Sequence, residues 1–164
     1  MIQVRELLPI SDPRPTISDP SNMKTIELDI VSAEASIFNG TVRFVSVTGT
    51  AGGLGIYPNH SPLLTALKPG QIHAILKDGS EEVFYMSGGM LEIQPHVISI
   101  LADTALRADD LDESAALAAK IQAEKILQQK KDGIDYSKAL SELAEAAAQL
   151  RAISLLRDKL KKMH

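Results

Sequence analysis

Short apolar runs alternate with turn residues between Met23 and about Leu106. In residues 24–30, polar and apolar side chains alternate with a period of two, as in a strand with one buried face. After a second such run at 41–48, further runs recur from residue 71 at intervals of about eight to twelve residues, a spacing typical of a β-sandwich or barrel. These runs cover residues 41–48, 71–76, 81–86, 90–93 and 97–101.

Glycine and proline mark the turns between these runs. Asn39-Gly40 and Asp78-Gly79 are typical of two-residue hairpin turns, in which both residues take positive φ. The glycine cluster at 49–55 predicts a turn between strands, and Ser87-Gly88-Gly89 predicts a tight bend. Prolines lie between the runs, where a missing N–H leaves no ladder hydrogen bond unmade, at Pro58, Pro62, Pro69 and Pro95.

After Asp109 the apolar period becomes helical. Asp110 is expected to cap a first helix, with Glu113 completing a capping box, and this helix should end at Asp132-Gly133. Asp135 is expected to cap a second helix from Tyr136 to about Lys161. The loop between them is so short that the two helices should be antiparallel neighbours.

The seam expected between these helices is rich in alanine, which buries little apolar area per residue. We therefore expect a weakly held hairpin, closed against itself or against the strands and able to open. Facing positions are predicted at Ala115, Ala118, Ala119, Ala139, Ala146 and Ala147, and the apolar series of the second helix also includes Leu143, Leu150, Ile153 and Leu160, with Arg157 in register.

These patterns predict an α+β protein, with an N-terminal antiparallel β-sandwich at 23–107 and a C-terminal antiparallel helical hairpin at 108–164. Residues 1–22 hold four of the eight prolines, which predicts a flexible N-terminal arm or an artificial extension. Neither a secretory signal nor an acid-poor transit peptide fits this segment. No apolar run reaches the roughly 20 residues of a bilayer span, so membrane association is expected only through a partner. A net charge of −4 disfavours nucleic acid as a partner.

Catalytic chemistry is not predicted. The glycine cluster lacks the Lys-Ser or Lys-Thr of a phosphate loop, and no serine lies in a nucleophile elbow. Histidines are scattered at His60, His73, His96 and His164, without a ligand partner at helical or strand spacing, so no metal site is expected. The acidic residues from Asp109 to Glu113 are typical of a solvated helix start. We predict neither an active site nor a cofactor.

The segment from Tyr57 to Thr65 has no catalytic interpretation. Pro58 and Pro62 should make it a rigid, protruding corner, which suits docking because little entropy is lost on binding. Two other function classes stay open on the residues alone. One is an enzyme that uses the acidic cluster at 103–113, and the other is an adaptor that presents 58–62 to an unrelated partner.

An ordered series of motifs resembles the epsilon subunits of bacterial F-type ATP synthases over 23–163: residues 54–64 (Leu-Gly-Ile-Tyr-Pro-Asn-His-Ser-Pro-Leu-Leu), Lys68-Pro69-Gly70, Ser87-Gly88-Gly89, residues 91–95 and residues 101–105. The resemblance implies a ten-stranded sandwich, a helical hairpin and a non-catalytic place in the central stalk of the rotor. The implied partners are the gamma subunit, the c-ring and, when the hairpin extends, the catalytic beta and alpha subunits. The implied location is peripheral, at the cytoplasmic face of the bacterial plasma (inner) membrane.

The resemblance also implies sites. The c-ring or gamma interface is expected at Ser32, Gly52, Gly53, Leu54, Tyr57, Asn59, His60, Ser61 and Thr65. Family members often carry glutamate where this chain has Ala51 and Gly53, so its ring contact should depend less on salt bridges. The last helix is expected to inhibit ATP hydrolysis by docking on acidic loops through Arg151, Arg157, Lys159, Lys161 and Lys162, which could otherwise serve only as a solvated helix end.

The residues that bind ATP in some family members are mostly replaced in this chain. The motif that binds ATP in some members reads Leu111-Asp112-Glu113-Ser114-Ala115-Ala116 here, so alanine replaces the arginine and only Asp112 is kept. Positions on the second helix that are basic in ATP-sensing members correspond to Glu145 and Gln149. We therefore expect ATP to bind weakly or not at all, with a dissociation constant roughly in the millimolar range or above.

Overall fold

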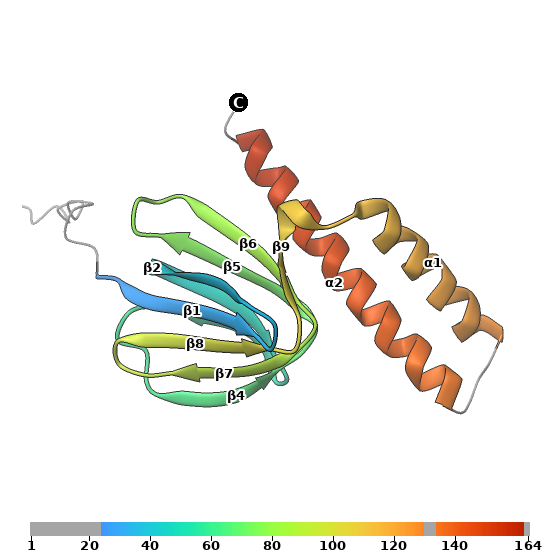
Figure 1. Cartoon of the computed structure of the whole chain (residues 1–164), viewed down its shortest axis with the longest axis horizontal. Coiled ribbons are helices and arrows are strands. Elements are labelled where there is room, and N and C mark those ends of the chain that lie inside the picture. Colours follow the sequence, from blue (N-terminus) through green and yellow to red (C-terminus); the bar gives the residue numbers. More distant parts are fainter. Residues whose placement is uncertain (1–23, 130–133, 163–164) are drawn as a thin grey trace, which may run out of the picture.

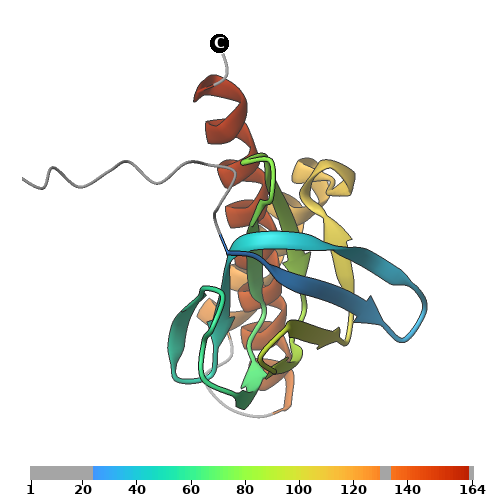
Figure 2. The same cartoon turned by 90° about the vertical axis from the view of Figure 1, so that its left-hand side faces the viewer.

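The computed structural model describes residues 24–129 and 134–162, which form a β-sandwich and two packed helices (Figure 1). The predicted α+β fold is confirmed. Figure 2 shows the strand layers facing each other, with the hairpin of the first two strands reaching beyond the rest. The described strands are β1 (Ile26–Ser32), β2 (Ser36–Gly49), β3 (Gly52–Ile56), β4 (Leu63–Leu67), β5 (Gly70–Leu76), β6 (Glu81–Met86), β7 (Gly89–Ile93), β8 (Val97–Ala102) and β9 (Ala105–Arg107).

Strand β2 explains why nine strands are described where the resemblance implies ten. It is 14 residues long, and its first half pairs with β1 while its second half pairs with β3 and β5. A strand that passes from one layer into the other can be counted as two. The sandwich also departs from a wholly antiparallel arrangement, because β1 runs parallel to β8.

The prediction of a hairpin turn at Asn39-Gly40 is wrong. Both residues lie inside β2, opposite Asp29 and Leu28 of β1. Gly40 provides space, because a Cβ there would lie 2.8 Å from Cζ of Phe38. The turn between β1 and β2 falls at 33–35 instead.

The turn at Asp78-Gly79 is confirmed, although not as a type I′ turn. Within the described residues, Gly79 has φ of 90° and Asp78 is not among the residues with positive φ. The amide of Gly79 donates to the carbonyl of Leu76 at 3.0 Å, which makes a three-residue hairpin loop with a left-handed glycine. The hydroxyl and amide of Ser80 donate to Asp78 and hold the pKa of that carboxyl below its usual value.

The core between the layers is aliphatic, with one aromatic cluster. Alternate residues of the strands face inward, among them Leu28, Ile30, Ile98 and Ile100, all fully buried. The buried Phe84 ring lies 5.4 Å from the Phe38 ring, and the guanidinium carbon of Arg107 lies 5.3 Å from the Phe84 ring centre. Such burial of branched side chains on both inner faces is what the period-two pattern predicts.

Helix α1 (Glu113–Gln129) begins later than predicted, because its cap is Asp112 and not Asp110. Oδ1 of Asp112 accepts the amide hydrogens of Ser114 and Ala115 at 2.9 and 3.1 Å. Asp110 lies in the short 3₁₀ helix η2 (Ala108–Asp110). Glu113 is therefore the first residue of α1 rather than the third, so the predicted capping box does not form.

Helix α2 (Ile134–Lys162) begins before the predicted Tyr136. The predicted helix end at Asp132-Gly133 lies outside the described residues. The predicted cap at Asp135 is wrong, because Asp135 lies inside α2 and not before its first residue.

Helices α1 and α2 pack side by side and antiparallel (Figure 1). The described helices bury Ala116 and Ala123 of α1 and Ala139, Ala146, Ala148 and Ala152 of α2, so two of the predicted seam alanines of α2, Ala139 and Ala146, are buried. On α1 the predicted face is wrong, because Ala115, Ala118 and Ala119 are exposed. An alanine-rich helix has no strong apolar stripe, so its sequence does not fix its rotation. On α2, Leu143, Ala147, Leu150 and Ile153 are half-buried, whereas Arg157 and Leu160 are exposed.

A second face of α2 packs on the sandwich. Ala148 and Ala152 of α2 join Val83 and Tyr85 of β6 and Ala108 of η2 in a small buried cluster, against which Leu111 and Leu156 pack. The hairpin thus closes both against itself and against the sandwich, two possibilities that the sequence left open.

The burial of Tyr85 under α2 makes stability depend on pH. Burial disfavours the charged phenolate and raises the pKa of Tyr85, while a hydrogen bond with Gln149 opposes this shift. Tyr85 loses its phenolic proton near pH 10 in the unfolded chain and at a higher pH in the folded chain. The free energy of unfolding should therefore be unaffected by Tyr85 below about pH 10 and fall above it.

Urea unfolding at several pH values tests this expectation. Tyr85→Phe should flatten the fall in stability above about pH 10. Tyr57→Phe, which removes a phenol from a side chain that is 62% exposed, is measured beside it as the matched substitution. Equal slopes in wild type and Tyr85→Phe would contradict the assignment.

Candidate functional site

The corner from Tyr57 to Thr65 is built around a tight turn. The amide of His60 donates to the carbonyl of Tyr57 at 3.1 Å, and Asn59 takes φ of 68°. Proline at the second position and a left-handed residue at the third are typical of a type II turn. Nδ1 of His60 lies 2.7 Å from the carbonyl oxygen of Ser61, which fixes the ring on its own backbone. The corner is therefore rigid, as the sequence predicts.

The corner ends in exposed apolar side chains. The ring of Tyr57 lies 4.7 Å from the ring of Phe44 and still exposes 62% of its surface. Leu64, at the start of β4, is 67% exposed beside a shallow groove of about 480 Å³ whose wall includes Pro62, Glu92 and Pro95. Ser61 is exposed, whereas Thr65 is half-buried within β4, opposite Leu91 of β7. These contacts suit recognition rather than bond-making chemistry.

The residues Gly52, Gly53 and Leu54 do not join this corner. They start β3, whereas Tyr57 follows its end, so the two predicted parts of the interface lie at opposite ends of that strand. Gly52 has φ of 134°, and a Cβ on Gly53 would have no heavy atom within 4 Å, so this end of β3 is open. Leu54 lines a shallow groove of about 300 Å³ with Ser46, Thr48 and Gln71.

Ser32 has a clear structural role. Its hydroxyl accepts the amide of Ala35 at 3.2 Å, and its own amide donates to the carbonyl of Ala35 at 2.9 Å. It therefore closes the turn between β1 and β2, at the end of β1 beside β8.

An exposed apolar row crosses the outer face of the sheet near Ser32, and the sequence analysis missed it. Leu101 of β8 lies beside Val31 of β1 and opposite Met90 of β7, and Met90 lies opposite Ala66 of β4. Leu101 is 57% exposed and Met90 is 40% exposed. The alternation within each strand places these residues outward, but only strand order brings them together. We call these residues, with Leu64, the apolar row.

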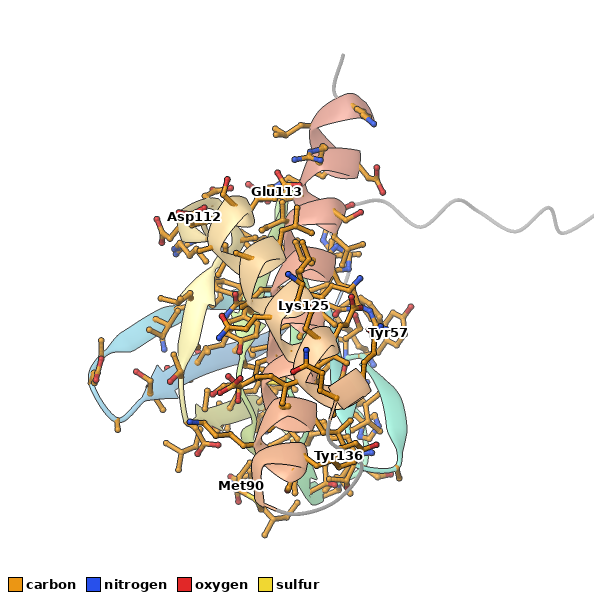
Figure 3. All side chains as sticks on the ribbon, turned by 90° about the vertical axis from the view of Figure 1, so that its right-hand side faces the viewer. Tyr57, Met90, Asp112, Glu113, Lys125 and Tyr136 are labelled. Carbon is orange, nitrogen blue, oxygen red and sulfur yellow. The ribbon has the colours of Figure 1, made fainter. Side chains whose placement is uncertain are left out.

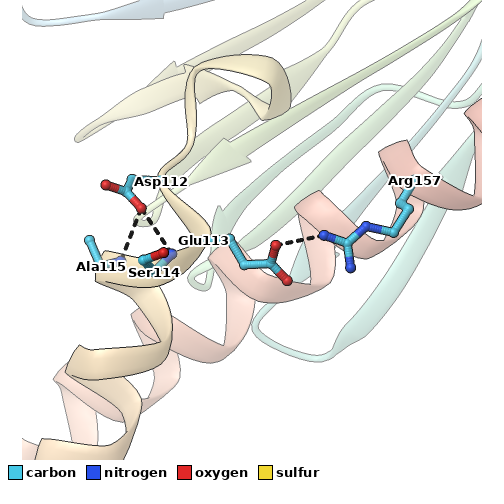
Figure 4. Close-up of polar contacts among 5 residues, drawn as sticks. All are labelled: Asp112, Glu113, Ser114, Ala115 and Arg157. Atoms are coloured by element: carbon cyan, nitrogen blue, oxygen red, sulfur yellow. Dashed lines mark hydrogen bonds and ion pairs between the residues drawn. The ribbon is translucent and has the colours of Figure 1, made fainter.

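We call Arg151, Arg157, Lys159, Lys161 and Lys162 the basic end of α2. Arg157 and Lys159 of this end already make contacts within the chain. Nη2 of Arg157 lies 2.6 Å from Oε2 of Glu113 on α1 (Figure 4). The ammonium of Lys159 donates to the backbone carbonyl of Glu81 on β6. Arg151 and Lys161 are exposed, and the side chain of Lys162 lies outside the described residues.

Asp112 is used in capping α1, so its carboxylate is already engaged by two amides. Figure 3 places Asp112 and Glu113 together at the start of α1, whereas Tyr57 and Met90 lie on different sides of the hairpin. Glu145 and Gln149 lie near Tyr85, on the face of α2 that turns to the sandwich. This arrangement offers little positive charge to a triphosphate.

Neither a metal nor a membrane span is suggested by the described part of the chain. It contains no group of three or more His, Cys, Asp or Glu side chains that could hold a metal ion. No helix within 24–129 and 134–162 is long and apolar enough to cross a bilayer.

Two protein-family models match adjacent segments of the chain. The model described as the ATP synthase delta/epsilon chain, beta-sandwich domain, matches residues 25–108. The model described as the ATP synthase delta/epsilon chain, long alpha-helix domain, matches residues 109–154.

Similar curated proteins are bacterial. The ATP synthase epsilon chain of Nitrosococcus oceani is 54% identical over 136 residues, which are 83% of this chain and 97% of that protein. The ATP synthase epsilon chain of Legionella pneumophila (strain Corby) is 54% identical over 137 residues, which are 84% of this chain and 98% of that protein.

Among solved structures, a chain of the Euglena gracilis mitochondrial ATP synthase, titled OSCP/F1/c-ring, superposes with a TM-score of 0.72 at 18% identity. That match covers 93% of this chain and 99% of the other. A chain of the Tetrahymena thermophila mitochondrial ATP synthase, titled central stalk/c-ring, gives a TM-score of 0.53 at 14% identity and covers 79% and 97%. At these identities the likeness concerns the fold.

Proposed function

We propose that this chain, which belongs to the ATP synthase delta/epsilon chain family, couples the gamma subunit to the c-ring and restrains ATP hydrolysis through its C-terminal helices. It is an epsilon chain, a non-catalytic subunit of the central stalk of F-type ATP synthase. Its proposed place is the cytoplasmic face of the bacterial inner membrane, reached only through the complex. Neither a nucleic acid nor a cofactor is part of this proposal.

The gamma subunit is the proposed partner of the apolar row and of neighbouring Ser32. Large exposed apolar side chains that lie side by side are typical of protein interfaces. The helices pack on β5, β6 and η2, so the hairpin leaves this face uncovered. We assign the c-ring contact to the open end of β3 at Gly52, Gly53 and Leu54. The corner at Tyr57, Asn59, His60, Ser61 and Thr65 lies at the other end of β3, and we assign it to the c-ring as well.

The inhibitory part of the proposal is carried by the small contact between α2 and the sandwich. Its buried apolar cluster joins Ala148 and Ala152 of α2 to Val83 and Tyr85 of β6 and Ala108 of η2, with Leu156 packed against it. Alanine buries so little area that detaching α2 should cost only a few kcal/mol. A detached α2 would present its basic end to acidic loops of the beta and alpha subunits.

Truncation tests this role. Removing residues 151–164 should raise the ATPase activity of the assembled enzyme, because the basic end can no longer dock. A pull-down with gamma provides the control, since the truncated chain should still bind through its sandwich. Unchanged ATPase activity after confirmed incorporation would contradict the inhibitory role and leave the coupling role standing.

A further inference from the structure

Arg157 and Glu113 connect parts of the chain that are far apart in sequence. They are 44 residues apart, and their side chains meet at 2.6 Å where the start of α1 passes the last turns of α2 (Figure 4). Glu113 is the first residue of α1, and the cap at Asp112 fixes the backbone beside it. The carboxylate of Glu113 is therefore presented to α2 from a well-defined position.

Neighbouring residues of α2 make further contacts with the sandwich. Lys159 donates to the carbonyl of Glu81, and Leu156 packs on the cluster formed with Val83 and Tyr85. Arg151 and Lys161 are exposed, and neither makes an ion pair among the residues that the structure describes. The basic end thus divides into cations that hold the closed hairpin and cations that face solvent.

We propose that Glu113 is an internal competitor for Arg157: it holds α2 closed through the guanidinium that would otherwise bind an acidic loop of a catalytic subunit. This proposal rests on the inhibitory role argued above. Closure of the hairpin and inhibition of the enzyme then both use the guanidinium of Arg157. Removing Glu113 should favour inhibition, whereas removing Arg157 should weaken both closure and inhibition.

The strength of this contact suits a latch that has to open. The Arg157 and Glu113 side chains are 56% and 50% exposed, so solvent and salt screen their attraction. Exposed ion pairs of this kind shift an equilibrium by roughly two- to fivefold. We therefore expect the ion pair to favour the closed hairpin without preventing its opening, and added salt should weaken this preference.

The first measurement follows opening in the isolated full-length chain. The chain has no cysteine, so Ser154→Cys on α2 and Thr41→Cys on β2 provide a unique dye pair for energy transfer. Glu113→Gln and Arg157→Gln should each raise the ratio of open to closed chains about two- to fivefold. Glu124→Gln is the matched control on α1, because Glu124 pairs with Lys120 of its own helix. The charge swap Glu113→Arg with Arg157→Glu should restore closure.

The second measurement is the ATPase activity of the assembled enzyme. Glu113→Gln should lower it, whereas Arg157→Gln and the charge swap should raise it. Arg151→Gln separates the two effects, because it should raise ATPase activity without changing the opening ratio.

The results separate the latch from the inhibitory role. A Glu113→Gln opening ratio equal to that of Glu124→Gln would overturn the latch, whatever the ATPase result. So would a charge swap that fails to restore closure. If the hairpin opens as expected and ATPase activity does not respond to either Glu113→Gln or truncation, the inhibitory role and the competition that rests on it both fail.

Discussion

Gly89→Ala should destabilise the sandwich by about 4 kcal/mol or prevent its folding, because strain and a backbone clash coincide at this position. Gly89 has φ of 141°, a conformation that side chains disfavour. A Cβ there would lie 2.1 Å from the carbonyl oxygen of Leu101 and 2.8 Å from Cα of Ala102. Both atoms belong to the backbone of β8, so no side-chain rotation can relieve the clash.

Urea unfolding of the isolated chain measures this effect. Gly53→Ala provides a matched control, because a Cβ at Gly53 would meet no heavy atom within 4 Å. We expect that variant to stay within about 0.5 kcal/mol of wild type. Similar stabilities for the two variants would show that the approach of β7 to β8 at Gly89 does not require glycine.

Leu101→Asp should weaken binding to the gamma subunit by about 100-fold, because it places a charge in the centre of the apolar row. The side chain is 57% exposed in the isolated chain and lies between Val31 and Met90. Burying a carboxylate there without a partner would cost more free energy than the leucine contributes through its contact area. Calorimetry with purified gamma measures the change, and urea unfolding verifies that the variant is folded.

Leu117→Asp is the control for this prediction. Leu117 is 48% exposed, which is close to Leu101, but it lies on α1 and away from the apolar row. Its substitution should leave gamma affinity within about twofold of wild type, since surface changes away from an interface have small effects. Equal losses for both variants would mean that gamma does not bind through the apolar row.

Period and turn chemistry were sufficient to predict most strands of this chain. The predicted run 81–86 coincides with β6, and the runs at 71–76, 90–93 and 97–101 fall within one residue of β5, β7 and β8. Strands β3, β4 and β9 were missed, because glycine dominates β3, β4 lies in the segment interpreted as a corner, and β9 has only three residues. The pair Asn39-Gly40 led to a wrong prediction of a turn, because Gly40 makes room for the Phe38 ring inside a strand.

The candidate site was less predictable than the fold. The rigidity of the corner follows from Pro58 and Asn59, whose conformations are local properties. The apolar row depends on which strands are neighbours, which single-strand patterns do not contain. Arg157 was predicted as part of the basic end, but its pairing with Glu113 depends on the rotation of two alanine-rich helices.

By itself, the sequence determined that apolar side chains alternate along short strands, that two helices follow, and that the second ends in positive charge. These are local properties, set by periodicity, turn residues and composition. Tertiary structure alone decided that Glu113 meets Arg157, that Leu101 meets Met90, and that α2 rests on β6. Each of these contacts joins residues distant in the chain, and packing of the whole core selects among the pairings that local preference permits.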